Sequence, residues 1–140
     1  MRRDVVGLAG AALFVSLVVA QPGMAASGLP AATKFKGDAR TAYQAANAYP
    51  QLARKLFCYC GCDKEKGAYH KKLYDCYADQ HAVECSICQG EMERAAEYKR
   101  QGMADDLIAK RIDLEYKSNY PYGQPSAALQ RYRALHHQKA

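Results

Sequence analysis

Three cysteines on alternate positions, in the segment FCYCGC at residues 57–62, constrain the fold of this chain more than any other feature. In an extended segment, alternate side chains point to the same side and their Cα atoms lie roughly 6.6 Å apart. That separation is near the upper limit for a disulfide, so bridges within the triplet would be strained. Gly61 allows the segment to bend. The sequence therefore predicts an irregular loop in which the sulfurs of Cys58, Cys60 and Cys62 face one point.

A second sulfur-rich segment, HAVECSIC, follows downstream. On a continuous helix over His81–Gln101, the side chains of His81, Cys85 and Cys88 share one face with Met92. Imidazole, thiol and thioether groups on one face favour a soft metal ion, although a methionine alone is more often a core residue.

The same spacing supports two other interpretations. A helix that begins near Glu84 places Cys85 and Cys88 in its first turns, where unpaired backbone N–H groups and the helix dipole stabilise a thiolate. That arrangement is typical of a redox-active C-x-x-C pair, in which Cys85 attacks and Cys88 resolves. The two residues are also close enough on a helix for a structural disulfide. The sequence leaves these alternatives open.

Cys76 and His70 lie between the two sulfur-rich segments. A single histidine beside two lysines is more often exposed than bound to a metal. The position of His70 among six thiols nevertheless makes it a candidate ligand. His136 and His137 lie near the C-terminus and are predicted to be tail residues without a role in the site.

The first 26 residues have the features of a secretory signal peptide. Arg2 and Arg3 precede an apolar run over Val5–Ala20, and small residues allow cleavage after Ala25 or Ala26. The run is short and poor in large side chains for a retained membrane anchor, which favours cleavage. The sequence therefore predicts an exported protein, periplasmic or secreted, with no membrane span after cleavage. The arginine pair also suits the twin-arginine route.

The mature chain is long enough for one small domain. Residues 27–37 are mostly small, include glycine and proline, and show no period, which predicts a flexible leader. Residues 38–117 carry helical patterns around the cysteines, and residues 118–140 are predicted to form a loop and a short C-terminal helix or tail. The predicted fold is a small all-α, cysteine-rich domain with an irregular CYCGC loop and no extended sheet.

Apolar residues at helical spacing, together with residues that begin or end helices, locate the expected helices. Pro50 separates two of them, because proline is tolerated in the first turn of a helix but not in its interior. Gly102 suits the end of the longest helix, and Ser126 suits the cap of the last one. The expected helices begin near Asp38, Pro50, Ala68, His81, Met103 and Ser126.

The formal net charge is +6, but basic residues are interspersed with acidic ones rather than gathered in a stripe. This distribution predicts a solvated surface that attracts anionic lipid or an acidic envelope protein, and it does not favour nucleic acid. No Ser-His-Asp arrangement, phosphate-binding loop or carboxylate pair is evident in the sequence, so hydrolase and kinase functions have no residues to support them.

The segments CYCGC, KLYDCY and HAVECSIC, with His70 between them, resemble a family of exported bacterial proteins named for a CYCXC (PCYCGC) motif. The resemblance extends from about Ala46 to Tyr116. The family has no established activity, and some members carry selenocysteine at a motif cysteine, which implies redox or soft-metal chemistry. Phe57 stands where the motif has proline, which implies a less rigid entry to the loop, and the lipobox cysteine of many members is missing.

Matched residue by residue, the resemblance implies functional roles for Cys58, Cys60, Cys62, His70, Cys76, His81, Cys85 and Cys88. The leading hypothesis is an exported protein that binds a soft transition metal ion, copper(I) or zinc, between the CYCGC loop and the helix of the second segment. Eight candidate ligands set an upper limit of two four-coordinate sites. The enzymatic alternative is a thiol oxidoreductase, although no βαβ pattern surrounds the C-x-x-C pair. The third hypothesis is a structural domain, held by three disulfides, that docks a partner protein.

Overall fold

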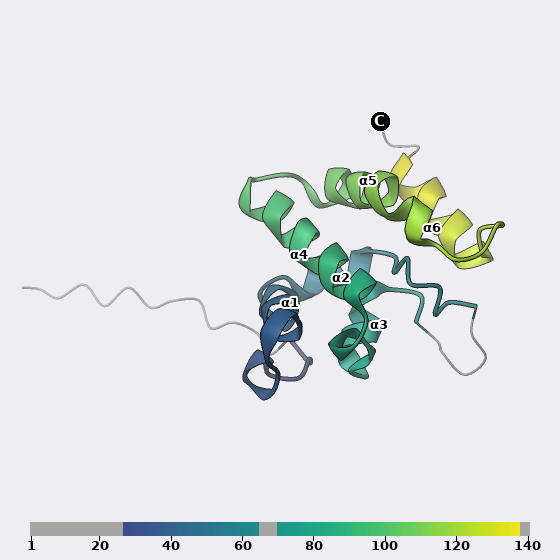
Figure 1. The fold of residues 1–140 in the computed structure, drawn as a ribbon. Coiled ribbons are helices and arrows are strands. Elements are labelled where there is room, and N and C mark those ends of the chain that lie inside the picture. The colour runs from purple at the N-terminus through teal and green to yellow at the C-terminus, as the bar shows by residue number, and fades with distance from the viewer. Residues whose placement is uncertain (1–26, 65–69, 138–140) are drawn as a thin grey trace, which may run out of the picture.

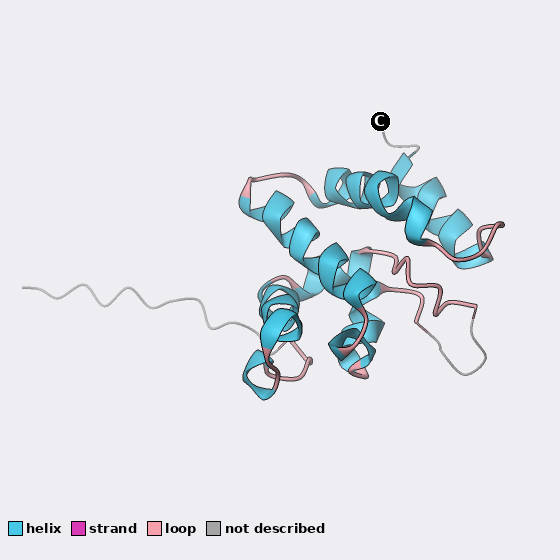
Figure 2. Cartoon of the chain, viewed as in Figure 1, coloured by secondary structure: helices cyan, strands magenta, loops and turns pink. Residues whose placement is uncertain are grey.

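Six α-helices joined by loops and 3₁₀ turns make up the structure, a computed structural model that describes residues 27–64 and 70–137 (Figure 1). No strand occurs within those two ranges (Figure 2). The prediction of an all-α fold is therefore confirmed. The predicted signal peptide lies outside the described residues. Within them, every helix is too short or too polar to cross a bilayer.

The first helix has 12 residues, and the next two have six each. α1 (Gly37–Ala48) is followed directly by α2 (Pro50–Lys55), and Pro50 opens α2 at the position where its missing N–H group is not needed. The helix expected from about Ala68 is α3 (Leu73–Ala78). Its expected first residues fall within 65–69, outside the described part of the chain.

The predicted leader packs against α1. It contains one 3₁₀ turn, η1 (Ala32–Lys34), and the ring centroid of Phe35 lies 4.2 Å from that of Tyr43. The side-chain amide of Asn47 donates a hydrogen bond to the carbonyl of Pro30 at 3.0 Å. These tertiary contacts were not expected from a segment of small residues without period.

The long helix predicted over His81–Gln101 is divided in the structure. A 3₁₀ turn, η2 (His81–Val83), comes first, and α4 (Ser86–Arg100) begins only after Cys85. The prediction of one continuous helix from His81 is therefore wrong. The alternative start near Glu84 is the correct one.

The break before α4 has local causes. Gln80 has a left-handed backbone, with a φ of 71°, which turns the chain after α3. The side-chain amide of Gln89 donates to the carbonyls of Ala82 and Val83 at 2.8 and 2.9 Å. Carbonyls that a continuous helix would have bonded internally are thus satisfied by a side chain. His81 consequently approaches the loop from a turn and not from the face of α4.

The C-terminal part is a pair of packed helices, α5 (Asp105–Tyr116) and α6 (Ala127–His137). Acidic residues in the first turn of α5 suit the positive end of the helix dipole. Ser126 caps α6, because the backbone N–H of Leu129 donates to its Oγ at 3.1 Å. Both helix starts agree with the local signals in the sequence.

The central helix is α4, which packs against α1 on one side and α5 on another, while α5 also packs against α6 (Figure 1). α2 and α3 contact each other beside this stack. Tyrosines supply much of the core: Tyr43 and Tyr77 are fully buried. The hydroxyl of Tyr43 donates to the carbonyl of Tyr77 at 3.0 Å, and the hydroxyl of Tyr77 donates to the carbonyl of Cys88 at 2.9 Å. Hydrogen bonds of buried tyrosines therefore connect the core to Cys88.

Candidate metal centre

The CYCGC loop is irregular and brings its sulfurs together. Gly61 has a φ of 89°, and a Cβ added there would lie 2.4 Å from Cγ of Pro121, so only glycine fits. The Sγ atoms lie 3.2 Å apart in Cys58 and Cys60, and 3.0 Å apart in Cys60 and Cys62. The three thiols converge, as the alternating spacing predicts.

Two acidic side chains hold the loop at the residue between its first two cysteines. The backbone N–H of Tyr59 donates to Oε1 of Glu91 at 2.7 Å, and the hydroxyl of Tyr59 donates to Oδ1 of Asp113 at 2.5 Å. Asp113 also accepts a hydrogen bond from Nε of Arg133 at 2.8 Å. The loop is therefore bonded to α4 and α5, and through Asp113 it is linked to α6.

Phe57 fixes the entry to the loop by packing. Its side chain is buried, and its ring centroid lies 5.2 Å from that of Tyr59, 6.0 Å from that of Tyr120 and 5.9 Å from that of Tyr132. A proline would restrict the backbone at this position. In this chain aromatic contacts restrain the same position from the side.

The remaining cysteines come from two helices. Cys76 lies on α3 and is fully buried, Cys85 is the residue before α4, and Cys88 lies in the first turn of α4. The Sγ atoms of Cys58 and Cys88 lie 3.2 Å apart, which joins the loop to α4. All six cysteines are thiols in the structure.

The ligand atoms fall into two groups of four, and within each group all four atoms lie within 4.8 Å of one another. A tetrahedral zinc–thiolate centre, with Zn–S bonds of about 2.3 Å, places its sulfurs roughly 3.8 Å apart. Each group is therefore of a size that one ion could occupy. The inner group is Cys58, Cys60, Cys76 and Cys88, and the outer group is Cys60, His81, Cys85 and Cys88.

The two groups differ in their access to solvent. In the inner group Cys58, Cys76 and Cys88 are buried. In the outer group Cys85 is half-buried and His81 is exposed. A cavity of about 550 Å³ is lined by both of these side chains. The inner group is thus enclosed by protein, while the outer group faces a hollow at the surface.

Two of the eight predicted ligands lie beside the groups and not within them. The Sγ of Cys62 lies 3.0 Å from that of Cys60 and 3.3 Å from Nε2 of His81. His70 forms an ion pair with Asp79, and its ring centroid lies 5.6 Å from that of His81. The structure therefore brings together six of the predicted residues in the two groups and places Cys62 and His70 next to His81.

Contacts among the thiols shift their pKa values in opposite directions. Hydrogen bonds with Cys58 and with the other neighbouring thiols lower the pKa of Cys60. The hydrogen bond with Cys60 raises the pKa of Cys58 and of Cys85, and those with Cys58 and then Cys60 raise the pKa of Cys88. One thiolate is thus stabilised at the expense of its neighbours. The redox hypothesis needs a lowered pKa at Cys85, which is the opposite direction.

Glu91 is a buried acid that the sequence did not single out. It lies one helical turn after Cys88 on α4 and is fully buried. Burial raises its pKa well above the ordinary value for glutamate. The sequence did contain a signal that places Glu91 near the site, because it follows Cys88 by three residues and residues three apart share a helix face.

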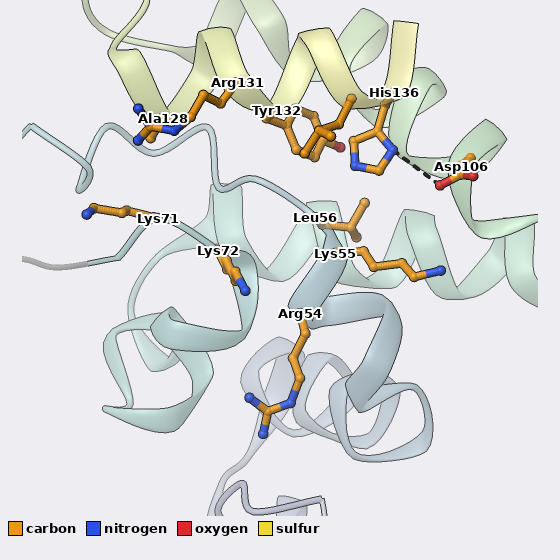
Figure 3. Close-up of a pocket in the computed structure, with 11 residues that line it drawn as sticks. Arg54, Lys55, Leu56, Lys71, Lys72, Asp106, Ala128, Arg131, Tyr132 and His136 are labelled. Atoms are coloured by element: carbon orange, nitrogen blue, oxygen red, sulfur yellow. Dashed lines mark ion pairs between the residues drawn. The ribbon is translucent and has the colours of Figure 1, made fainter. Parts of the chain in front are cut away.

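A second cavity, of about 410 Å³, lies between α2 and α6 (Figure 3). Lys71, Lys72 and Arg131 are among its cationic lining residues. Figure 3 shows these side chains diverging, and the guanidinium of Arg54 lies 3.4 Å from the ring centroid of Tyr74. The cations therefore do not converge on one point, and none of the cysteines lines this cavity.

A small all-α domain that gathers thiols from a loop and two helices defines the class: a cysteine-cluster protein with a candidate metal centre. Residues 21–129 match the model of a protein family of unknown function with a PCYCGC motif, and the chain belongs to that family. The resemblance seen in the motif segments is thereby confirmed. No curated protein and no solved structure matches the chain.

Proposed function

We propose that this protein binds a soft transition metal ion, copper(I) or zinc, in its cysteine cluster after export from the cytoplasm. The observation that carries the proposal is the pair of four-atom groups formed by five sulfurs and the imidazole of His81. Thiolate and imidazole are the ligands that zinc and copper(I) prefer. An exported protein with such a centre suits capture or delivery of these ions outside the cytoplasm.

Charge favours a metal ion over a set of bare thiols. Five sulfurs in contact cannot all ionise in a buried site, because their charges repel and lack solvation. A bound cation supplies the opposite charge and allows several thiolates at once. The directions of the pKa shifts agree with this limit: hydrogen bonds with its neighbours lower the pKa of Cys60, while the pKa values of Cys58, Cys85 and Cys88 are raised.

The contact pattern favours a chelate over three separate disulfides. Cys60 contacts Cys58 and Cys62 at the similar distances of 3.2 and 3.0 Å, and Cys58 also contacts Cys88 at 3.2 Å. A domain held by disulfides joins its sulfurs two by two. Here Cys58 and Cys60 each contact two other sulfurs, which a set of separate pairs does not require and a chelate does.

Intact-mass measurement on protein purified from the exported fraction tests the proposal. The native protein should carry the additional mass of zinc or copper, and the denatured chain should have the mass of six thiols. A metal-free chain lighter by about six hydrogens would support three disulfides and contradict the proposal. The mass should also show cleavage after Ala25 or Ala26, as the export part of the proposal requires.

Substitution of one ligand provides the second test. Cys60→Ser should lower metal content and thermal stability together, because ligand loss and unfolding are coupled. Ile108→Val is the control: Ile108 is fully buried in the core on α5, and its side chain has no atom that could bind a metal. It should retain the wild-type metal content. Unchanged metal content in Cys60→Ser would exclude the loop as a ligand.

A further inference from the structure

The two groups of ligand atoms have two sulfurs in common. Cys60 and Cys88 belong to both groups, so each of their sulfurs lies within 4.8 Å of the other and of the sulfurs of Cys58, Cys76 and Cys85. Cys85 and His81 belong only to the outer group. Cys58 and Cys76 belong only to the inner group.

Sharing determines how many ions the ligands can hold. Two independent four-coordinate sites need eight ligands, whereas the two groups contain six different residues. One ion would leave either Cys58 and Cys76 or His81 and Cys85 without a metal. Two ions use all six residues only if Cys60 and Cys88 bind both of them, and a thiolate sulfur has enough lone pairs to do so.

We propose that the cluster is a dinuclear centre in which the thiolates of Cys60 and Cys88 bridge two divalent ions of the zinc type. The inference rests on the proposed metal-binding function and makes it more specific. Each ion has four ligands: the shared pair with Cys58 and Cys76 for the inner ion, and the shared pair with His81 and Cys85 for the outer ion.

Charge and geometry select a divalent ion. Five thiolates carry five negative charges, of which two divalent ions neutralise four and two copper(I) ions only two. The unneutralised charge is costly in a site whose inner half is buried. Zinc also takes four sulfur and nitrogen ligands in a tetrahedron, which is the number that each group provides.

The surroundings of the two positions predict different roles for the two ions. Cys58 and Cys76 are enclosed, with 1% and 0% of their surface exposed, so the inner ion can leave only if the fold opens. His81 and Cys85 line the surface cavity, so the outer ion can exchange from the folded protein. The inner ion therefore stabilises the domain, and the outer ion is the one available for transfer.

Titration of the full mature chain with zinc, followed by native mass spectrometry, tests the stoichiometry. The wild type should bind two ions. Cys85→Ser removes a ligand of the outer ion from a half-buried position, so it should bind one ion and keep its folded structure. His136→Gln is the control and should bind two, because His136 lies on α6 against Asp106 and outside both groups. Cys88→Ser should bind none.

Cadmium-113 in place of zinc tests the bridges directly. Two resonances should appear in the NMR spectrum, coupled to each other through the shared sulfurs. A chelator should remove one ion rapidly and the other only at the rate of unfolding. In Cys85→Ser the rapid phase should be missing.

The outcomes separate the two proposals. Saturation of the wild type at one ion would overturn the dinuclear centre and leave the proposed function intact, whereas binding of no ion would overturn both. Two uncoupled cadmium resonances, or loss of only one ion in Cys88→Ser, would exclude the bridging thiolates. Release of both ions at one rate would exclude the separate roles.

Discussion

Gly61 and Gly102 have almost the same φ, 89° and 84°, but different surroundings. A Cβ at Gly61 would lie 2.4 Å from Cγ of Pro121, whereas a Cβ at Gly102 would have no atom within 4 Å. Substitutions at the two positions therefore distinguish the effect of backbone strain from that of steric contact. It also shows how the loop depends on a segment far away in the sequence.

Alanine at the two positions should have unequal effects. Gly102→Ala should lower the free energy of unfolding by about 1–2 kcal/mol, the cost of a left-handed conformation. Gly61→Ala should add about 1–3 kcal/mol for the overlap with Pro121 and should also reduce zinc binding, because the sulfurs move. Urea unfolding of both variants measures the difference. Equal losses would show that the Pro121 segment does not brace the loop.

Two substitutions of Glu91 test the hydrogen bond that it accepts from the loop. Glu91→Gln keeps an acceptor for the N–H of Tyr59 and should change the free energy of unfolding little, since burial already favours the neutral acid. Glu91→Leu leaves that buried N–H without an acceptor and should cost about 1–3 kcal/mol. Denaturant unfolding of the zinc-loaded variants tests this order. A leucine variant as stable as the glutamine variant would show that the bond does not hold the loop.

At the level of elements, helix ends were predictable where single residues determine them. Pro50 and Ser126 locate the starts of α2 and α6, because proline and serine act on the backbone next to them. The break before α4 was not predictable from period, because His81, Cys85 and Cys88 fit a continuous helix equally well. The conformation of Gln80 and the bonds made by Gln89 decide the break, and neither leaves a periodic signal.

α6 docks on α5 partly through histidines that the sequence assigned to a tail. Nδ1 of His136 lies 3.3 Å from Oδ1 of Asp106, and Nε2 of His137 lies 2.9 Å from Oδ2 of Asp113. Burial lowers the pKa of His136, aided by Lys55 and His137, although Asp106 opposes the effect. The last turn of α6 is thus half-buried against α5 through its histidines, while Leu135 remains exposed.

This environment predicts a loss of stability in mild acid. Below the unfolded pKa of His136, about 6.5, the unfolded chain binds a proton that the folded chain resists, so the free energy of unfolding falls. Stability from this group is complete above that pH and decreases through the lower folded pKa. Between pH 7.5 and 5.5 the wild type should lose more stability than His136→Gln, measured by urea unfolding. Equal losses would assign the pH dependence to other groups.

For the whole molecule, the cluster joins segments that are distant in sequence: the CYCGC loop, α3 and the start of α4. The alternating cysteines were sufficient to predict that the sulfurs converge. They could not predict that Cys60 and Cys88 are shared, because that depends on how α3 and α4 pack beside the loop. The positions of Cys62 and His70 next to the groups are decided by the same packing.

Zinc should therefore stabilise the entire domain. A ligand that binds only the folded state adds about 2.7 kcal/mol when its concentration is one hundred times Kd. The melting temperature should rise with zinc concentration in the wild type and should not respond in Cys60→Ser. Magnesium is the control, since it prefers oxygen ligands and should have no effect. A melting temperature independent of zinc would separate metal binding from folding.

The contact between the sulfurs of Cys58 and Cys88 has a consequence for the order of events in a cell. Touching thiols are readily joined by an oxidant, and a sulfur in a disulfide no longer ligates as a thiolate. Oxidation and the proposed loading with metal would therefore compete for the same sulfur atoms, and the first to occur would prevent the other. If the chain is exported, translocation in an already folded and loaded state would protect these sulfurs from the oxidising environment beyond the membrane.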